Sequence, residues 1–183
     1  MTRFKWLVMA PLLLVAMAAS FAADYWDDGT VRHEYQLIQA NHITWPDAGG
    51  WIETNLGPVW YLATVTSQAE QTFITQTVFH DHVGEYWIGG YQDPRDSPPA
   101  ENWHWVTGEP WVYTNWDPSE PNDNYGPGSE YYLGANWVGQ YWNDEGSVEP
   151  IVGFLAERTT PEPATLALLG LGLAGLGFSR RGR

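Results

Sequence analysis

The sequence predicts an α+β fold, in which two helices pack on short antiparallel strands and a long irregular loop occupies the second half. Three observations lead to this prediction. Residues 43–55 and 68–78 begin with helix-start signals, and short β-prone stretches lie before and after them. Residues 93–130 contain seven prolines, which interrupt any long element. A loop of this length in a compact domain usually carries function.

The first 23 residues are typical of a signal peptide. Arg3 and Lys5 precede an apolar run that ends near Met17, and small residues follow. The run is shorter than the roughly 20 residues that a membrane-spanning helix needs. We therefore assign residues 1–23 to a signal peptide and residues 24–32 to a leader, with a retained anchor as the alternative.

The C-terminal segment has the order of a sorting signal. Pro161, Glu162 and Pro163 precede an apolar stretch of about 15 residues, marginal for crossing a bilayer, and three arginines end the chain. This order resembles the PEP-CTERM sorting tail of Gram-negative bacteria, here residues 159–183. The resemblance implies a short transmembrane segment that holds the protein in the membrane, with the arginines cytoplasmic, until an exosortase-like enzyme processes the tail. A plain C-terminal anchor is the alternative.

Composition narrows the possible partners. The chain has 22 acidic and 8 basic residues, and between the terminal segments the basic residues are only Arg32, Arg95 and Arg158. Nucleic acid is excluded as a partner, because neutralising phosphates needs clustered bases. The chain has no cysteine, which removes thiol catalysis and zinc–thiolate sites. Its 12 tryptophans indicate a core or a binding surface built from large rings.

The first half of the domain is expected to contain a strand and a helix. Residues 24–30 are polar and are expected to be irregular. Residues 33–39 alternate between apolar and polar side chains, as in a strand. Residues 43–55 are expected to form a helix with Thr44 as its N-cap.

A capping box marks the start of the second helix. Ser67 and Glu70 stand three positions apart, which predicts a helix over residues 68–78, after a β-prone segment at residues 60–65. The side chains expected to face the core are Phe73, Ile74 and Thr77.

The remaining strands are expected to be short. Residues 86–91 are apolar and end at glycines, as in a buried strand. Further strands are expected at residues 103–106, 131–137 and 139–142. An apolar strand at residues 151–157 closes the domain.

The long loop concentrates hard oxygen donors. Calcium takes 6–8 oxygen ligands from carboxylates, amide carbonyls and water, whereas zinc prefers histidine or cysteine. Carboxylates and amides gathered in one loop therefore favour calcium. Those in the loop and on the strand that follows are Glu120, Asn122, Asp123, Asn124, Glu130, Asn143 and Asp144.

Short motifs follow one another in a definite order along residues 34–158. They are Thr44-Trp45-Pro46-Asp47-Ala48, Leu62-Ala63-Thr64-Val65, Trp87-Ile88-Gly89-Gly90, Glu120-Pro121-Asn122, Trp142-Asn143-Asp144 and the closing Gly153-Phe154-Leu155-Ala156-Glu157. In this order they resemble the landmarks of the C-type lectin-like family. The resemblance implies a domain over residues 33–158 with the C-type lectin-like fold and its long calcium-binding loop.

The resemblance also implies ligands for calcium and for sugar. The Glu-Pro-Asn tripeptide resembles the mannose/glucose type, in which the bond before the proline is cis. Vicinal sugar hydroxyls would complete the ion's coordination and hydrogen-bond to its ligands. The residues implied for both calcium and carbohydrate are Glu120, Asn122, Glu130, Asn143 and Asp144. Glu130 lies about two positions later than in typical members. The aromatic residues that could pack against the sugar ring, or alternatively belong to the core, are Tyr125, Trp116 and Trp142.

The sequence also departs from the family. The positions that resemble its disulfide partners hold Ile52, Tyr132 and Ala156, so packing is expected to replace the bridges. Tyr131 stands where many members have an acidic ligand of an auxiliary calcium. A second ion in this chain would fall at Asp123, with Glu101 or Asp96.

The sequence favours a binding protein over an enzyme. No serine lies in a nucleophile elbow, and the paired acids lack an obvious cleft. His80-Asp81-His82 could ligate a transition metal or form a solvated surface. We predict an exported calcium-dependent lectin, at the cell surface or outside a Gram-negative type envelope, for a glycan or exopolysaccharide. The alternative is a non-catalytic domain for a protein or matrix partner, with calcium structural or absent.

Overall fold

The computed structural model describes residues 23–161. The expected signal peptide and, beyond Pro161, the rest of the expected sorting tail with Glu162 and Pro163 lie outside these residues. Within residues 23–161 no helix has the length and apolar character needed to cross a bilayer.

The expected α+β fold is confirmed, and one sheet runs through the whole domain. In residues 23–161 the sheet has eight strands in the order β1-β2-β8-β4-β6-β7, with β3 paired to β8 and β5 paired to β4. The β4–β8 pair is parallel and the other pairs are antiparallel, so the sheet is mixed where the sequence predicts antiparallel strands. The elements are β1 (Asp24–Asp27), β2 (Val31–Gln39), α1 (Trp45–Asn55), β3 (Tyr61–Leu62), α2 (Gln68–Phe73), a π-helical turn (Ile74–Val78), β4 (Glu85–Gln92), β5 (Trp103–Trp105), β6 (Tyr132–Ala135), a 3-10 turn (Val138–Gln140), β7 (Asn143–Glu145) and β8 (Ile151–Pro161).

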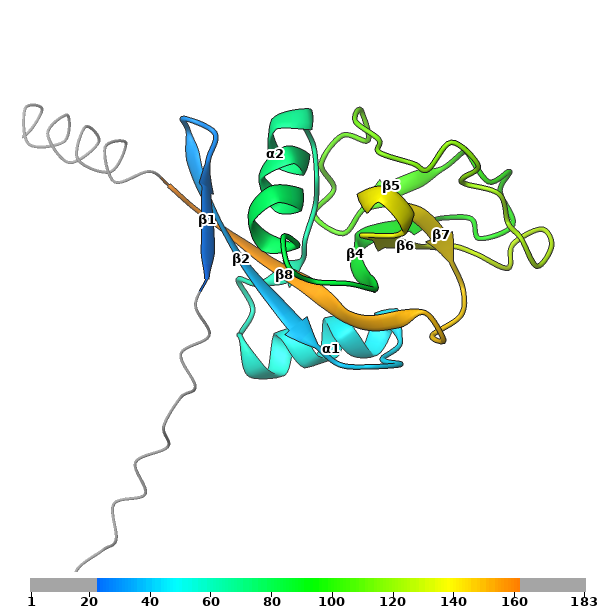
Figure 1. The fold of residues 1–183 in the computed structure, drawn as a ribbon, viewed down its shortest axis with the longest axis horizontal. Helices are drawn as coiled ribbons and strands as arrows, with labels where there is room; N and C mark the ends of the chain where they lie inside the picture. Colours follow the sequence, from blue (N-terminus) through cyan, green and yellow to red (C-terminus); the bar gives the residue numbers. More distant parts are fainter. Residues whose placement is uncertain (1–22, 162–183) are drawn as a thin grey trace, which may run out of the picture.

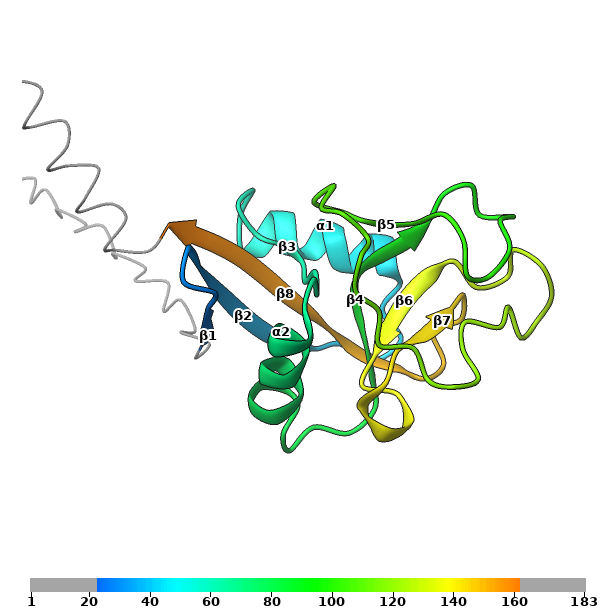
Figure 2. The same cartoon turned by 90° about the horizontal axis from the view of Figure 1, so that it is seen from above.

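The two helices cover opposite faces of the long strand β8 (Figure 2). Because side chains alternate along a strand, Phe154 and Ala156 join the hydrophobic cluster under α1, while Leu155 joins the cluster under α2. Strands β5, β6 and β7 and the long loop lie at the end of the domain away from β1 (Figure 1). This arrangement leaves the loop uncovered by either helix.

The first strand was not expected from the sequence. Asp24–Asp27 form β1 and pair with residues 32–35 of β2, where we expected an irregular leader. An Asp-Gly turn explains the hairpin: the Asp28 carboxylate accepts the N–H groups of Thr30 and Val31 at 2.7 and 2.8 Å, and Gly29 adopts a φ of 90°. These hydrogen bonds lower the pKa of Asp28 to about 2.

The second helix begins as expected but ends differently. The Ser67 hydroxyl accepts the N–H of Glu70 at 3.2 Å, so the predicted N-cap is confirmed. The last turn, Ile74–Val78, is π-helical, and a wider turn changes which side chains face inward. Ile74 is buried as expected and Phe73 is half-buried, but Thr77 is exposed and Val78 takes its place in the core.

Two strand predictions also need correction. Residues 139–142 do not form a strand. A 3-10 turn spans Val138–Gln140, and positive φ values at Gly139 and Gln140 break the extended backbone. Pairing instead resumes at Asn143, in β7. Of the β-prone residues 60–65 only Tyr61–Leu62 pair, with β8.

Packing takes the place of disulfides, as the missing cysteines require. The cluster under α1 contains Ile52 and Ala156, and Tyr132 packs against it. Tyr132 also stacks on Trp45 with a centroid distance of 4.6 Å. The family's bridge positions therefore contribute to one apolar cluster in this chain.

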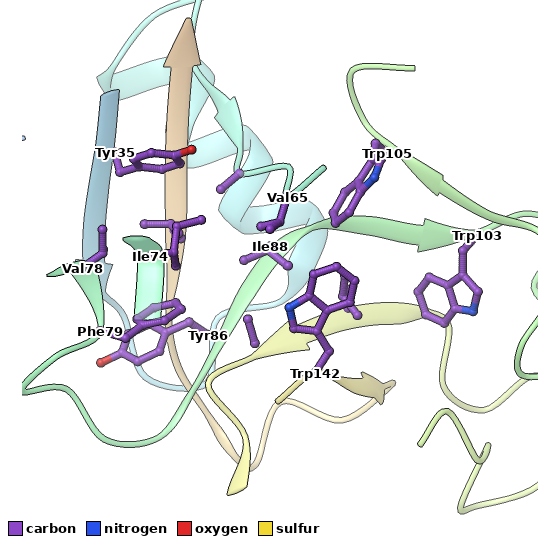
Figure 3. Packing of buried hydrophobic residues seen from close by; sticks show 14 residues of the cluster. Tyr35, Val65, Ile74, Val78, Phe79, Tyr86, Ile88, Trp103, Trp105 and Trp142 are labelled. Atoms are coloured by element: carbon purple, nitrogen blue, oxygen red, sulfur yellow. The ribbon is translucent and has the colours of Figure 1, made fainter. Parts of the chain in front are cut away.

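The cluster under α2 extends into a tryptophan core that joins the sheet to the long loop. Trp142 is fully buried, and its indole N–H donates to the Gln71 side chain at 2.9 Å. Trp105 meets it edge to face at 5.7 Å, and both rings belong to the cluster drawn in Figure 3. Trp116, in the second half of the loop, meets Trp142 in the same way at 5.8 Å. The residue before Asn143 and Asp144 is thus anchored in the core.

A buried polar cluster ties α2 to the long strands. His33 Nδ1 lies 2.7 Å from a Glu157 carboxylate oxygen, and the Tyr35 hydroxyl donates to Glu70 at 2.7 Å. Burial alone would lower the pKa of His33, but the bond to Glu157 and the charges of Glu157, Glu70 and Asp28 raise it overall. Burial and the neighbouring Glu157 raise the pKa of Glu70 to about 7.

Candidate functional site

Backbone hydrogen bonds hold residues 115–117 of the long loop against Trp142, the residue that precedes β7. The N–H of Trp142 donates to the Asn115 carbonyl at 2.8 Å, and the N–H of Asp117 donates to the Trp142 carbonyl at 3.0 Å. Asp117 in turn accepts the N–H of Glu120 at 2.9 Å. These bonds bring Glu120 next to the residues that follow Trp142.

The structure brings the five predicted site residues together. Four of them, Glu120, Asn122, Glu130 and Asn143, line one cavity of about 220 Å³. The fifth, Asp144, lies directly beneath the tripeptide: its carboxylate accepts the N–H of Asn122 at 2.9 Å and the N–H of Asp123 at 2.9 Å. The Glu120–Pro121 bond is cis, as the resemblance implies.

Glu130 reaches the cavity in spite of its displaced position in the sequence. The Asp123 carboxylate accepts the N–H groups of Gly128, Ser129 and Glu130 at 2.7, 3.0 and 2.9 Å, which folds the inserted residues into a closed turn. Glu130 then accepts the N–H of Asn124 at 2.6 Å. The insertion is therefore absorbed within the turn.

The same contacts bear on the second ion expected at Asp123. One carboxylate oxygen from each of Asp123, Glu130 and Asp144 lies within 4.8 Å of the others. Glu101 and Asp96 are exposed. Asp123 therefore groups with Glu130 and Asp144, and not with the two acids paired with it from the sequence.

The cavity is strongly acidic. Burial first, and then the neighbouring Asp144, raise the pKa of Glu120 to about 7. Burial also raises the pKa of Glu130 to about 7, with contributions from Asp144, Glu145 and Asp123. One carboxylate oxygen of Glu120 is buried without a hydrogen-bond partner. Crowded carboxylates and an unpartnered buried oxygen fit a divalent cation bound by oxygen ligands.

The cavity is also lined by four residues that we did not assign as ion ligands from the sequence. They are Asn124, Tyr125, Trp137 and Glu145. Glu145 could have been found, because it lies two residues after Asn143 on the same face of a strand. Trp137 carries no such signal. Of the aromatic residues expected to contact sugar, Tyr125 lines the cavity and is 75% exposed, whereas Trp142 is fully buried and Trp116 packs against the tryptophan core.

The histidine cluster lies elsewhere on the surface. His80 and Asp81 form a pair at 2.8 Å in which both side chains are largely exposed. In the described part of the chain, the groups of three whose ligand atoms lie within 4.8 Å of one another are Asp123–Glu130–Asp144 and His33–Glu70–Glu157. This favours the solvated-surface interpretation of His80-Asp81-His82.

The raised pKa values predict an unusual pH dependence without calcium. A carboxyl group whose folded-state pKa lies above its ordinary 4.5 binds a proton that the unfolded chain releases, so its contribution to stability is lost as pH rises. Glu70, Glu120 and Glu130 titrate near 7 and Glu85 near 9. His33, with its raised pKa, changes stability in the same direction.

In EDTA the melting temperature should therefore fall between pH 5 and pH 9, and calcium should reduce the fall by stabilising the ionised carboxylates. Thermal unfolding followed by circular dichroism measures both. A melting temperature that rises with pH in EDTA would contradict the prediction.

Comparison with known proteins agrees with the geometry. Residues 60–150 match the family model "Lectin C-type domain", and residues 159–181 match the "PEP-CTERM protein-sorting motif". The chain is 30% identical to human C-type mannose receptor 2 over 123 residues, which cover 57% of this chain and 8% of the receptor. It is 31% identical to rat lithostathine over 87 residues, which cover 46% of this chain and 48% of lithostathine. The chain thus spans about half or less of the length of these relatives.

Solved structures show the same fold. Human lithostathine superposes with a TM-score of 0.60 at 20% identity, covering 82% of this chain and 97% of that one. The cow CD23 carbohydrate-recognition domain, solved in the presence of a GlcNAc2Man3 oligosaccharide, gives a TM-score of 0.57 at 21% identity, covering 75% and 98%. The chain therefore contains a C-type lectin domain and, after it, a PEP-CTERM sorting motif.

Proposed function

We propose that this chain is an exported, non-catalytic lectin that binds glycans of the mannose/glucose type, or an exopolysaccharide that contains them, through one calcium ion. The observation that carries the proposal is the convergence of carboxylate and amide oxygens on one cavity, with a buried oxygen of Glu120 left unpartnered. The calcium ligands would be Glu120, Asn122, Glu130, Asn143 and Asp144.

The ion would supply an electrophilic centre to which two vicinal hydroxyls of a sugar attach. The chain's own residues would orient that sugar. Glu120 and Glu130 can accept hydrogen bonds from hydroxyl protons, while the amides of Asn122 and Asn143 can donate to hydroxyl oxygens. Hydrogen bonds to ionised groups are about twice as strong as those between neutral groups.

The walls of the cavity also suit a carbohydrate. Tyr125 and Trp137 both line it, and Tyr125 is exposed. Aromatic rings beside a polar floor present an apolar surface to the C–H face of a sugar while the hydroxyls meet the floor. Asn122 and Asn124 are exposed at the same cavity, where their amides can reach a ligand from solvent.

The sorting motif supports the proposed setting. A PEP-CTERM motif follows the lectin domain, with Pro161 at the end of β8. We propose that the protein is exported across a Gram-negative envelope, held in the membrane by its tail, and processed by an exosortase-like enzyme. The site would then act at the cell surface or outside the cell.

Exchanging the amide and the carboxylate of the tripeptide tests the proposed contacts. In Glu120→Gln with Asn122→Asp the ligand count is kept, but hydrogen-bond donors and acceptors change places. We expect the preference for mannose over galactose to shift toward galactose by about tenfold or more, about 1.4 kcal/mol. Inhibition of glycan binding by the two free sugars, in calcium, measures the shift.

The chain offers a matched control. Glu53 and Asn55 have the same spacing and are exposed on α1, far from the loop in sequence. Glu53→Gln with Asn55→Asp makes the same chemical exchange and should leave the preference unchanged. A tripeptide variant with native specificity would refute the assignment of these residues to sugar contact.

A further inference from the structure

Glu85, the first residue of β4, is a buried carboxylate for which neither the fold nor the proposed lectin site gives a role. The residue is 1% exposed, and both carboxylate oxygens are buried without a hydrogen-bond partner. An ionised carboxylate in such a place costs several kcal/mol unless it is neutralised. The group therefore requires either a proton or a cation.

Its position across the sheet is specific. The side chain crosses Gly134 of β6: a Cβ atom added at Gly134 would lie only 1.9 Å from a Glu85 oxygen. Gly134 pairs with Asn143 of β7. A glycine at this point is what allows the Glu85 carboxylate to reach toward β7.

Glu145 is the second carboxylate of this region. It is buried, and one of its oxygens accepts a hydrogen bond from the Asn143 amide at 3.2 Å. Side chains two residues apart on a strand share a face, so Glu145 lies on the same face of β7 as Asn143, the residue that pairs with Gly134. The Glu85 carboxylate, which crosses Gly134, therefore reaches toward the side of β7 that carries Glu145.

The buried carboxylate lies beside a route to solvent. Glu85 lines a cavity of about 510 Å³ together with His82, Asn136 and Trp137. Trp137 also lines the smaller lectin cavity, and so does Glu145. Two neighbouring cavities thus lead to the two carboxylates, one to Glu85 and the other to Glu145.

We propose that Glu85 and Glu145 hold a second divalent cation, behind Asn143 and next to the first. Two carboxylates with up to four oxygens favour calcium, and water from the larger cavity would complete the coordination. The proposal goes beyond the proposed function, since it needs neither a sugar nor the first ion. The second ion would neutralise Glu145 and fix the amide of Asn143, which belongs to both regions.

Calcium titration of the full chain by isothermal calorimetry, up to about 10 mM to include weak sites, tests the proposal. We expect two ions per native chain. Glu85→Gln keeps the shape and removes the charge, and should bind one ion and still bind mannose. Asp144→Asn should lose the other ion and keep the one that depends on Glu85. Glu53→Gln, which replaces an exposed residue of α1, should bind two ions.

The outcomes separate this proposal from the lectin function. If the native chain and Glu85→Gln each bind one ion, and Asp144→Asn binds none, the second site is refuted and the two carboxylates share a proton instead, while the first site stands. If the native chain lacks only the calcium-binding event that depends on Asp144, the lectin site is refuted and the second site stands.

Thermal unfolding gives a second readout that does not depend on counting ions. In EDTA the Glu85→Gln variant should melt at or above the native temperature, because a buried unpaired carboxyl group has been removed. In calcium it should melt below the native protein, because one stabilising ion has been lost. The same order of melting temperatures in both conditions would overturn the proposal.

Discussion

Replacing Asp144 with asparagine is expected to lower the affinity of the loop site for calcium by about 100-fold or more, about 2.7 kcal/mol. Asp144 is fully buried and makes two contributions. It supplies a carboxylate to the cluster with Asp123 and Glu130, and it accepts the N–H groups of Asn122 and Asp123, which orders the tripeptide. An asparagine side chain loses the charge and can offer only one acceptor oxygen to those N–H groups.

Calcium titration at pH 7 measures the loss, and the control is Asp81→Asn. The Asp81 side chain is 89% exposed, and within residues 23–161 it forms an ion pair with the exposed His80. Its replacement should therefore leave the affinity for calcium unchanged. Glycan binding by Asp144→Asn should fall in parallel. An Asp144→Asn variant that binds calcium as tightly as the native protein would show that the loop does not hold the ion in the proposed way.

Replacing Trp142 with alanine is expected to destabilise the fold by about 3–5 kcal/mol, the range for removing a large buried aromatic residue. The ring is fully buried and packs edge to face against Trp105, Trp116 and Tyr113. Alanine would also leave the Gln71 side chain without the indole N–H. Because Trp142 anchors residues 115–117, which lead into the Glu120 tripeptide, calcium binding should weaken as well.

Urea unfolding in EDTA isolates this effect from ion binding, because a bound ion adds its own stabilisation. Trp137→Ala is the matched control. Trp137 is half-buried at the cavity and lies outside both hydrophobic clusters, so its loss should cost less than about 1 kcal/mol. It should instead weaken glycan binding. Equal destabilisation by the two substitutions would contradict the role given to Trp142.

Local signals in the sequence were sufficient for the starts of the helices and for residues that the structure brings together at one cavity. Thr44 and Ser67 cap the helices that they predict, because a side-chain cap depends on residues only three apart. The two tripeptides pointed to the cavity for the same reason, since each is contiguous: Glu120, Asn122 and Asn143 line it, and Asp144 contacts the first tripeptide. Glu130 was displaced in sequence and still reaches the cavity, because the turn organised by Asp123 absorbs the insertion.

Features that depend on pairing between distant residues could not be predicted in this way. β1 is polar, and its side chains alternate between half-buried and exposed. It becomes a strand only because β2 offers an edge with which it can pair. Glu85 stands before an apolar run and could be taken for an exposed strand end. Only the register of three strands shows that it crosses Gly134 toward Asn143 and Glu145.

Calcium-dependent recognition of sugar can be tested by glycan-array binding of the native protein in calcium and in EDTA. We predict binding to mannose- or glucose-type glycans in calcium, loss of that binding in EDTA, and recovery when calcium is restored. Glycan binding that is absent, or that persists unchanged in EDTA, would contradict it and favour a protein or matrix partner with calcium in a structural role.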